Sequence, residues 1–236
     1  MNITDYLKKL NKNGQDIFEE SIKDSENLGK IHHHSSFIGE FSEFVFDENE
    51  KKMILTVAIQ LESATFNLIY GMYREAFSSL RLAFELGLGA IHFSVHKLEQ
   101  NEWMNGENDI KWSKLIDNEN GVLSKRFSNA FFPELTEYIE EYSAKSRNAY
   151  RRMSEFVHGN YDTWNKSGLK LKFNPNLKED YFELNNIVSE IIIFMLCCRY
   201  LKSLTQGDKE TISEFLLEEL KHISPIREYL GGPKEI

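Results

Sequence analysis

The chain has 236 residues, of which 41% are hydrophobic and 28% are charged, and its net charge is −9. This length and balance favour one globular domain over residues 1–236, and the negative charge excludes broad, nonspecific binding to nucleic acids. The two cysteines, Cys197 and Cys198, are adjacent, which excludes a disulfide scaffold and favours a reducing, cytoplasmic location.

The first quarter of the chain predicts one helix and one connection. Apolar residues recur at helical spacing over 4–28, which predicts a helix. A signal peptide is not expected, because the basic start followed by an apolar segment that marks one is missing. Residues 30–47 interrupt this pattern with histidines, serines and Gly39, which predicts a connection with at most one helical turn. Three consecutive histidines cannot all converge on one ion, so His32, His33 and His34 favour a solvated loop over a metal site.

Two apolar helices are predicted next. Residues 48–70 are apolar almost all round, as in a helix that packs on several sides. Gly71 predicts a tight turn into a second helix over 72–96, and the short link predicts an antiparallel hairpin. Residues 97–132 are polar and show no continuous helical pattern. Their large apolar side chains are expected to anchor the segment on the core: Trp103, Trp112, Leu115, Phe127, Phe131 and Phe132.

The second half of the chain predicts three further helices. Pro133 begins a helix that runs to about His158, with Gly159 as its cap. Residues 160–177 lack a helical period, and alternation predicts a short strand or hairpin near 163–174. A long helix over 179–204 contains an apolar run of about eight residues, far short of the ~20 that span a bilayer. Asp208 is the expected N-cap of a last helix over 209–222, ended by Pro225. The whole pattern predicts an all-α helical bundle built on a central antiparallel hairpin.

One motif suggests chemistry. On the helix that ends at His158, Arg151 and His158 lie within about 20° of each other and off the apolar face, whereas Arg152 points elsewhere. Histidine transfers protons near neutral pH, and a guanidinium stabilises the negative charge that grows on a phosphoryl group. The pair suits metal-independent RNA cleavage, in which the 2′-hydroxyl is the nucleophile. The simpler interpretation is an exposed arginine and a helix-end histidine favoured by the helix dipole.

Two further features accompany the motif. Arg81 and Glu85 lie four residues apart on a charged stripe that also holds Arg74 and His92, which predicts a structural ion pair or support for the Arg151/His158 face. Residues 143–172 contain seven basic and two acidic residues, a net charge of +5, which leaves −14 for the rest of the chain. That contrast predicts a confined anion site. Its expected RNA-binding residues are Lys145, Arg147, Lys166 and Lys170.

The segment from Arg151 to Asn160 resembles the signature of the HEPN superfamily, an arginine followed after four to six residues by histidine. Both Arg151 and Arg152 satisfy this spacing, and Ser154 with His158-Gly159-Asn160 matches an ending found in many bacterial relatives. The helix Tyr73-Arg74-Glu75-Ala76-Phe77-Ser78-Ser79-Leu80-Arg81-Leu82-Ala83-Phe84-Glu85 is also similar. The resemblance covers about residues 50–204, with the helices 4–28 and 209–222 as additions.

The resemblance implies a helical bundle, commonly a homodimer in which two Arg/His faces meet in one cleft, and a metal-independent ribonuclease of toxin–antitoxin or antiviral defence systems. It makes His158 the general acid and base, and Arg151 or Arg152 the phosphate ligand, with Arg81, Glu85, Ser154 and Asn160 in support. RNA and a protein partner, such as an antitoxin or defence component, are the expected partners; no cofactor, metal or membrane is expected.

Two alternatives remain open at this point. Many active members carry Asn, Asp or His directly after the arginine, whereas here Met153 follows Arg152 and Arg152 follows Arg151. This departure suits a non-catalytic helical interaction module, the partner subunit of such a system. A small-nucleotide sensor, with Arg74 and Arg81 holding phosphates, is the third possibility.

Overall fold

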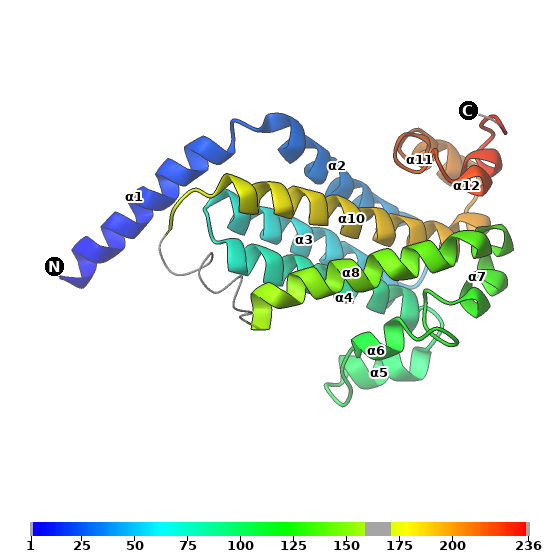
Figure 1. Cartoon of the computed structure of the whole chain (residues 1–236). Coiled ribbons are helices and arrows are strands. Elements are labelled where there is room, and N and C mark those ends of the chain that lie inside the picture. The colour runs from blue at the N-terminus through cyan, green and yellow to red at the C-terminus, as the bar shows by residue number, and fades with distance from the viewer. Residues whose placement is uncertain (1, 159–170, 235–236) are drawn as a thin grey trace.

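The computed structural model describes residues 2–158 and 171–234, and these residues form helices, turns and loops without a strand. The prediction of an all-α fold is confirmed. Figure 1 shows a bundle of long helices that run side by side, with short helices gathered at one end and α1 projecting from the other.

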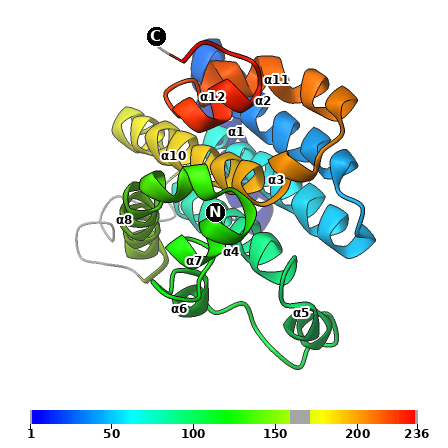
Figure 2. The ribbon, with the colours of Figure 1, turned by 90° about the vertical axis from the view of Figure 1, so that its right-hand side faces the viewer.

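The core of the bundle is made by five helices. They are α2 (Ser25–Phe41), α3 (Glu48–Ile69), α4 (Tyr73–Phe93), α8 (Ile139–His158) and α10 (Pro175–Tyr200). Viewed along the bundle, α8 lies on one side and α2 with α3 on the other, with α4 and α10 between them (Figure 2). The predicted positions of α3 and α4 agree with the structure to within a few residues, and Gly71 between them has φ 74°, which a residue with a side chain rarely adopts.

The expected connection at 30–47 is wrong. Helix α1 (Ile3–Ser21) ends early, and Asp24 caps α2 by accepting a hydrogen bond from the backbone N–H of Asn27. Helix α2 then carries the three histidines, and the one-turn η1 (Ser42–Phe44) follows it. The helix forms because the apolar residues hidden among the polar ones share a buried face; they are Ile31, Phe37, Ile38 and Phe41.

The polar segment that follows α4 folds as short helices: α5 (Lys97–Met104), α6 (Trp112–Leu115) and α7 (Lys125–Phe131). The expected anchoring of this segment on the core by its large apolar side chains is confirmed. Leu115, Phe127 and Phe132 are buried, and Trp103, Trp112 and Phe131 are partly buried against the same core.

The helix predicted from Pro133 has two parts. Pro133 begins the 3₁₀ helix η2 (Pro133–Tyr138), and α8 proper follows. Gly159 and most of the strand expected near 163–174 lie outside the described residues. The described part, 171–174, leads into α10 without a strand, and the backbone N–H of Asn174 donates to the hydroxyl of Tyr73, 2.7 Å away.

The C-terminal boundaries also require correction. After α10 and the short η3 (Leu201–Ser203), α11 (Gln206–Glu219) begins earlier than expected because Thr205 is its cap. Asp208 is the third residue of the helix and closes a capping box with Thr205. Pro225 begins a further helix, α12 (Ser224–Tyr229), instead of ending one.

Among the described residues, the span from Pro175 to Ser203 is long and apolar enough to cross a membrane by length and composition alone. Most of its residues are buried against other helices of this chain, as in the central helix of a bundle. Cys197 and Cys198 lie in this buried part as free thiols, and burial raises the pKa of both.

Candidate functional site

The Arg/His motif occupies the last two turns of α8. Met153 and Phe156 hold these turns to the core, and the ring of Phe156 stacks on Phe77 of α4 with 3.8 Å between centroids. This packing fixes which face of α8 points outward, because successive residues are turned by about 100°.

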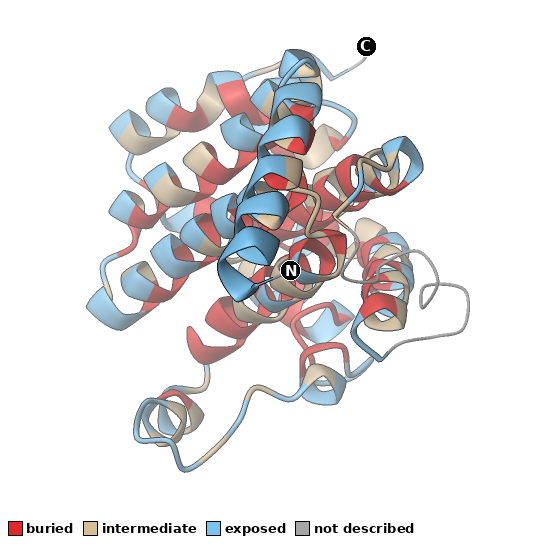
Figure 3. Ribbon diagram, turned by 90° about the vertical axis from the view of Figure 1, so that its left-hand side faces the viewer, coloured by how far each residue is buried: buried red, intermediate tan, exposed pale blue. Residues whose placement is uncertain are grey.

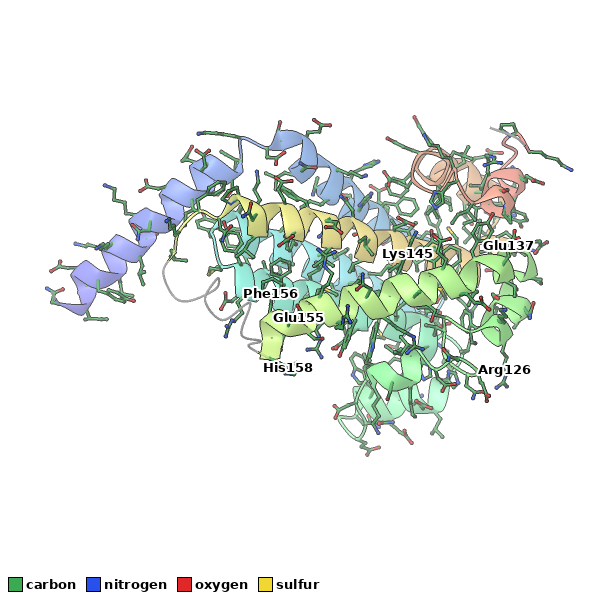
Figure 4. The ribbon with its side chains drawn as sticks, in the orientation of Figure 1. Arg126, Glu137, Lys145, Glu155, Phe156 and His158 are labelled. Carbon is green, nitrogen blue, oxygen red and sulfur yellow. The ribbon has the colours of Figure 1, made fainter. Side chains whose placement is uncertain are left out.

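Arg151 and His158 are both exposed on that outward face. The guanidinium of Arg151 contacts the side chain of Asn148 one turn earlier, at 3.5 Å, the long end of hydrogen-bond distances. Figure 4 shows His158 at the very end of α8, with Glu155 and Phe156 in the preceding turn and Lys145 far back along the helix. The spacing argument thus agrees with the exposure of these two residues.

Arg152 is directed to a different element. Its two terminal nitrogens donate to both carboxylate oxygens of Glu183 on α10, at 2.7 and 3.1 Å, and one of them lies 3.9 Å from Asp180. This bidentate geometry is the strong form of an arginine–carboxylate pair. The hydrogen bond from Arg152 lowers the pKa of Glu183, and the same bond raises the pKa of Arg152.

The charged stripe of α4 meets α8 just before the motif. Arg81 donates to Glu85 at 3.1 Å, and the hydroxyl of Tyr150 donates to the same carboxylate oxygen at 2.8 Å. The guanidinium of Arg81 lies 4.5 Å from the centre of the Tyr150 ring, on which Trp112 also stacks at 3.8 Å. Burial, and then the carboxylate of Glu85, raise the pKa of Tyr150.

Helical spacing predicted the Arg81–Glu85 pair, and the structure confirms it. The spacing did not indicate that Tyr150 and Trp112 join the pair, so their polar and stacking roles were missed. The available signal was the pair itself: Arg81 and Glu85 lie between two apolar stripes, where charged groups need hydrogen-bond partners. The network joins α4, α6 and α8 immediately beside Arg151.

His92 is not brought to this network, although helical spacing placed it on the same stripe of α4. It is buried near the other end of α4, 3.2 Å from Glu99, and its ring stacks on His96 with 4.0 Å between centroids. Burial lowers its pKa. Arg74 lies in the first turn of α4 and is partly exposed.

The other predicted residues are dispersed. The hydroxyl of Ser154 donates to the carbonyl of Tyr150 within α8, at 2.7 Å. Lys145 is held by Glu141 and Glu190, at 2.9 and 3.4 Å, and Arg147 donates to the carbonyl of Ile116, at 2.6 Å. Both cations are therefore engaged within the chain. Asn160, Lys166 and Lys170 lie outside the described residues.

A cavity of about 680 Å³ lies between α2, α10 and the end of α11, away from the Arg/His motif. Half of its lining residues are glutamates, and the full lining comprises Glu26, Gly29, Lys30, His33, Glu190, Glu218, Glu219 and His222. The three histidines of α2 diverge here. His32 lies 2.8 Å from Glu62, His34 is buried 2.9 Å from Glu219, and His33 borders the cavity.

No protein-family model, curated protein or solved structure matches the chain. What the protein does is therefore inferred from its own residues.

Proposed function

We propose that the protein is a HEPN-like, metal-independent endoribonuclease that acts as a cytoplasmic homodimer in a toxin–antitoxin or antiviral defence setting. The observation that supports this best is the exposure of Arg151 and His158 on one face of the last two turns of α8. Those turns are held by buried Met153 and Phe156, so the two side chains project from a fixed element.

The proposed reaction is transesterification within RNA. The 2′-hydroxyl attacks the adjacent phosphorus, its oxygen forms the new bond, and the bond from phosphorus to the 5′-oxygen breaks. One imidazole takes the proton of the 2′-hydroxyl and a second, protonated imidazole gives a proton to the leaving 5′-oxygen. The products are a 2′,3′-cyclic phosphate and a 5′-hydroxyl. A homodimer in which two α8 faces meet supplies both imidazoles, one His158 from each copy.

Arg151 is the better candidate for the phosphate ligand. Its guanidinium is exposed beside one asparagine, whereas Arg152 is engaged by a carboxylate on α10. A phosphate that recruited Arg152 would leave Glu183 without its cation, which costs part of the binding energy. We therefore assign charge stabilisation to Arg151, and to Arg152 the attachment of α8 to α10.

In this proposal α3 and α4, joined at Gly71, form the central hairpin of a HEPN-like core over about 50–204. The Arg81–Glu85–Tyr150 network then has a supporting role. It ties α4 to the residue that directly precedes Arg151, and so fixes the rotation of α8 about its own axis. Such fixing matters because a small misplacement of a reacting group costs a large factor in rate.

The test is cleavage of total cellular RNA and of a tRNA pool by purified protein with a chelator present. We expect the wild-type chain to cleave, and His158→Ala to lose at least about 100-fold in rate. The matched control is His33→Ala, which removes an exposed histidine on α2. Equal loss in both variants, or cleavage unchanged in His158→Ala, contradicts the assignment.

A second candidate is a non-catalytic interaction module, the partner subunit of such a system. It is favoured by the engagement of Arg152 with Glu183 and by Met153, where many active relatives carry a polar residue. A folded protein that cleaves no RNA across a range of salt concentrations, for wild type and variant alike, supports this candidate over the nuclease.

A further inference from the structure

Helix α1 extends from the end of the bundle as an arm (Figure 1). Within the described part of the chain, the buried residues of α1 lie in its last turns: Gly14, Ile17 and Ser21 are buried, and Ile17 packs over Gly71. Figure 3 shows the rest of α1 largely exposed, up to the N-terminus. An isolated helix of this length is marginal in water unless an apolar face is covered.

The exposed part of α1 carries an apolar stripe. Ile3, Leu7 and Leu10 follow each other at intervals of four and three residues, on the same face as the buried Ile17. Ile3 is 68% exposed and Leu7 is 55% exposed. The lysines of the arm, Lys8, Lys9 and Lys12, lie on the opposite face by helical spacing.

A second exposed apolar stripe runs along α3. Leu55, Ile59 and Phe66 share one face, and Ile59 and Phe66 are 61% and 57% exposed. Glu62 lies between them and is 47% exposed, and its carboxylate turns towards α2, where it meets His32 at 2.8 Å and the hydroxyl of Ser35. The stripe is therefore apolar except at this ion-paired glutamate.

Aromatic rings connect the two stripes. The ring of Phe18 on α1 lies 5.3 Å from that of Tyr70, and Tyr70 lies 4.9 Å from Phe66 on α3. Arm and helix thus form one apolar surface, which we call the α1–α3 surface: Ile3, Tyr6, Leu7, Leu10, Phe18, Leu55, Ile59, Phe66 and Tyr70.

We propose that the α1–α3 surface binds a second copy of this chain, with the arm of each copy packed on α3 of the other. Six of its side chains are more than a third exposed, at on the order of 100 Å² each, or about 600 Å² per copy. A reciprocal contact then buries about 1,200 Å² in total, which is the lower bound for a stable protein interface. The surface is also self-complementary, since each copy offers one helical stripe and receives one.

The charge of α1 as a whole favours a protein over a lipid surface. Its exposed first turns carry Asp5 and three lysines, and the turns packed on the body carry Asp16, Glu19 and Glu20, so the helix has a net charge of −1. Helices that lie on membranes carry an excess of lysine and arginine on their polar face, whereas acidic residues outnumber lysines over the length of α1, and Glu62 adds a carboxylate to the α3 part of the surface. Because the charged groups of α1 lie away from its stripe, covering the stripe with another helix leaves them in water.

This contact is independent of the proposed nuclease. Helices α3 and α8 lie on opposite sides of the bundle (Figure 2), so the α3 part of the contact is on the far side from the Arg151/His158 face. If the α8 faces also pair, the two contacts together give an assembly larger than a dimer. For the α1–α3 dimer alone, or for a closed tetramer built from both contacts, loss of the α1–α3 contact halves the mass of the assembly.

Cysteine cross-linking tests the contact directly. The native Cys197 and Cys198 are buried, so introduced thiols react without interference. Copies with Leu7→Cys are mixed with copies that carry Leu55→Cys, Ile59→Cys or Phe66→Cys and are then oxidised. We expect a covalent heterodimer from at least one pair. The control pair joins Leu7→Cys with Leu98→Cys, which is 74% exposed on α5 and lies outside the surface. Cross-linking no greater than in the control for all three pairs overturns the proposal.

Mass in solution is the second measurement. The mass is measured by size-exclusion chromatography with light scattering. We expect Leu7→Glu and Ile59→Glu each to have half the mass of the wild type, and Leu98→Glu to have the same mass as the wild type. Both positions are exposed, so the fold tolerates the charge, and an unchanged far-ultraviolet circular dichroism spectrum verifies this. A wild-type monomer at high concentration overturns the proposal, as does binding of the wild type, but not of Leu7→Glu, to phosphatidylcholine–phosphatidylserine vesicles.

Discussion

Arg151 and Arg152 are adjacent in sequence and have different surroundings. A turn of about 100° between neighbours directs Arg151 to solvent and Arg152 to α10, where Glu183 accepts two hydrogen bonds from it. Two arginines that satisfy the same motif spacing therefore separate into one that is available to an anion and one that is held by the fold. Their variants differ accordingly: we assign the cleavage defect to Arg151→Ala and the stability defect to Arg152→Ala.

The stability defect of Arg152→Ala is expected to depend on pH. The pKa of Glu183 is lowered from its ordinary value of 4.5 by the hydrogen bond from Arg152. The pair therefore stabilises the fold above that pH, and it ceases to do so as the pH falls and the carboxylate is protonated. Since both groups are partly exposed, we expect Arg152→Ala to lower the free energy of unfolding by about 0.5–1 kcal/mol at neutral pH. This loss should shrink towards zero as the pH falls below the lowered pKa of Glu183.

Urea unfolding across this pH range measures the effect. The control is Arg126→Ala, which removes an exposed arginine that donates to the neutral side chain of Asn120. A loss of stability in Arg152→Ala that is the same at acid and neutral pH would show that its packing, and not its charge, holds α8 to α10.

At the scale of elements, local periodicity predicted the helices that bury a continuous apolar face. Helices α3, α4 and α10 were placed to within a few residues for this reason. Helix α2 was missed because His32, His33, Ser35 and Ser36 conceal the apolar residues that a helix brings to one side. The capping residue Asp24 was the available signal, and it was assigned to the interior of a single longer helix.

Local sequence patterns likewise predicted one part of the candidate site and missed the other. Rotation along one helix predicted that Arg151 and His158 share an exposed face. The partners of Arg152 and Tyr150 could not be predicted, because Glu183 and Glu85 come from helices 31 and 65 residues away in sequence. Packing decides which of many carboxylates such residues meet, and no local pattern records that choice.

The turn between α3 and α4 gives a prediction at this scale. Gly71 and Gly106 both have φ 74°, so alanine is strained at either position. At Gly71 an added Cβ also lies 2.8 Å from Ile17 Cδ1, whereas at Gly106 it meets no atom within 4 Å. We expect Gly106→Ala to lower the free energy of unfolding by about 1 kcal/mol. Gly71→Ala should lower it by about 2 kcal/mol or more, because Ile17 of α1 must move as well.

Chemical unfolding of the two variants measures the difference. Gly207→Ala, in the first turn of α11 with no atom near its added Cβ, controls for the substitution itself and is expected to be close to neutral. Equal losses at Gly71 and Gly106 would show that the contact with Ile17 adds nothing to the turn.

For the whole molecule, the net charge says less about RNA binding than whether each basic side chain is already paired within the chain. The net charge of −9 is spread unevenly, and the segment 143–172 is basic. Within its described part, however, Lys145 lies between two glutamates and Arg147 is bound to the loop after α6. A polyanion that approaches α8 therefore meets Arg151 near its C-terminal end, and a largely neutralised surface further back.

The salt dependence of RNA binding tests this arrangement. Each phosphate neutralised by a cation contributes about −0.7 to the slope of log K against log salt for a single strand. We expect a negative slope for the His158→Ala protein, used so that the RNA stays intact during binding. Adding Arg151→Gln should make the slope less steep by about 0.7, whereas adding Lys145→Gln should leave it unchanged, because Glu141 and Glu190 already neutralise that lysine. Binding that is insensitive to salt would contradict an electrostatic RNA surface altogether. An equal effect of the two substitutions would instead show that RNA also contacts Lys145. The ion pairs of Lys145 with Glu141 and Glu190 would then have to open on binding, and the RNA contacts would extend from the Arg/His end to the middle of α8.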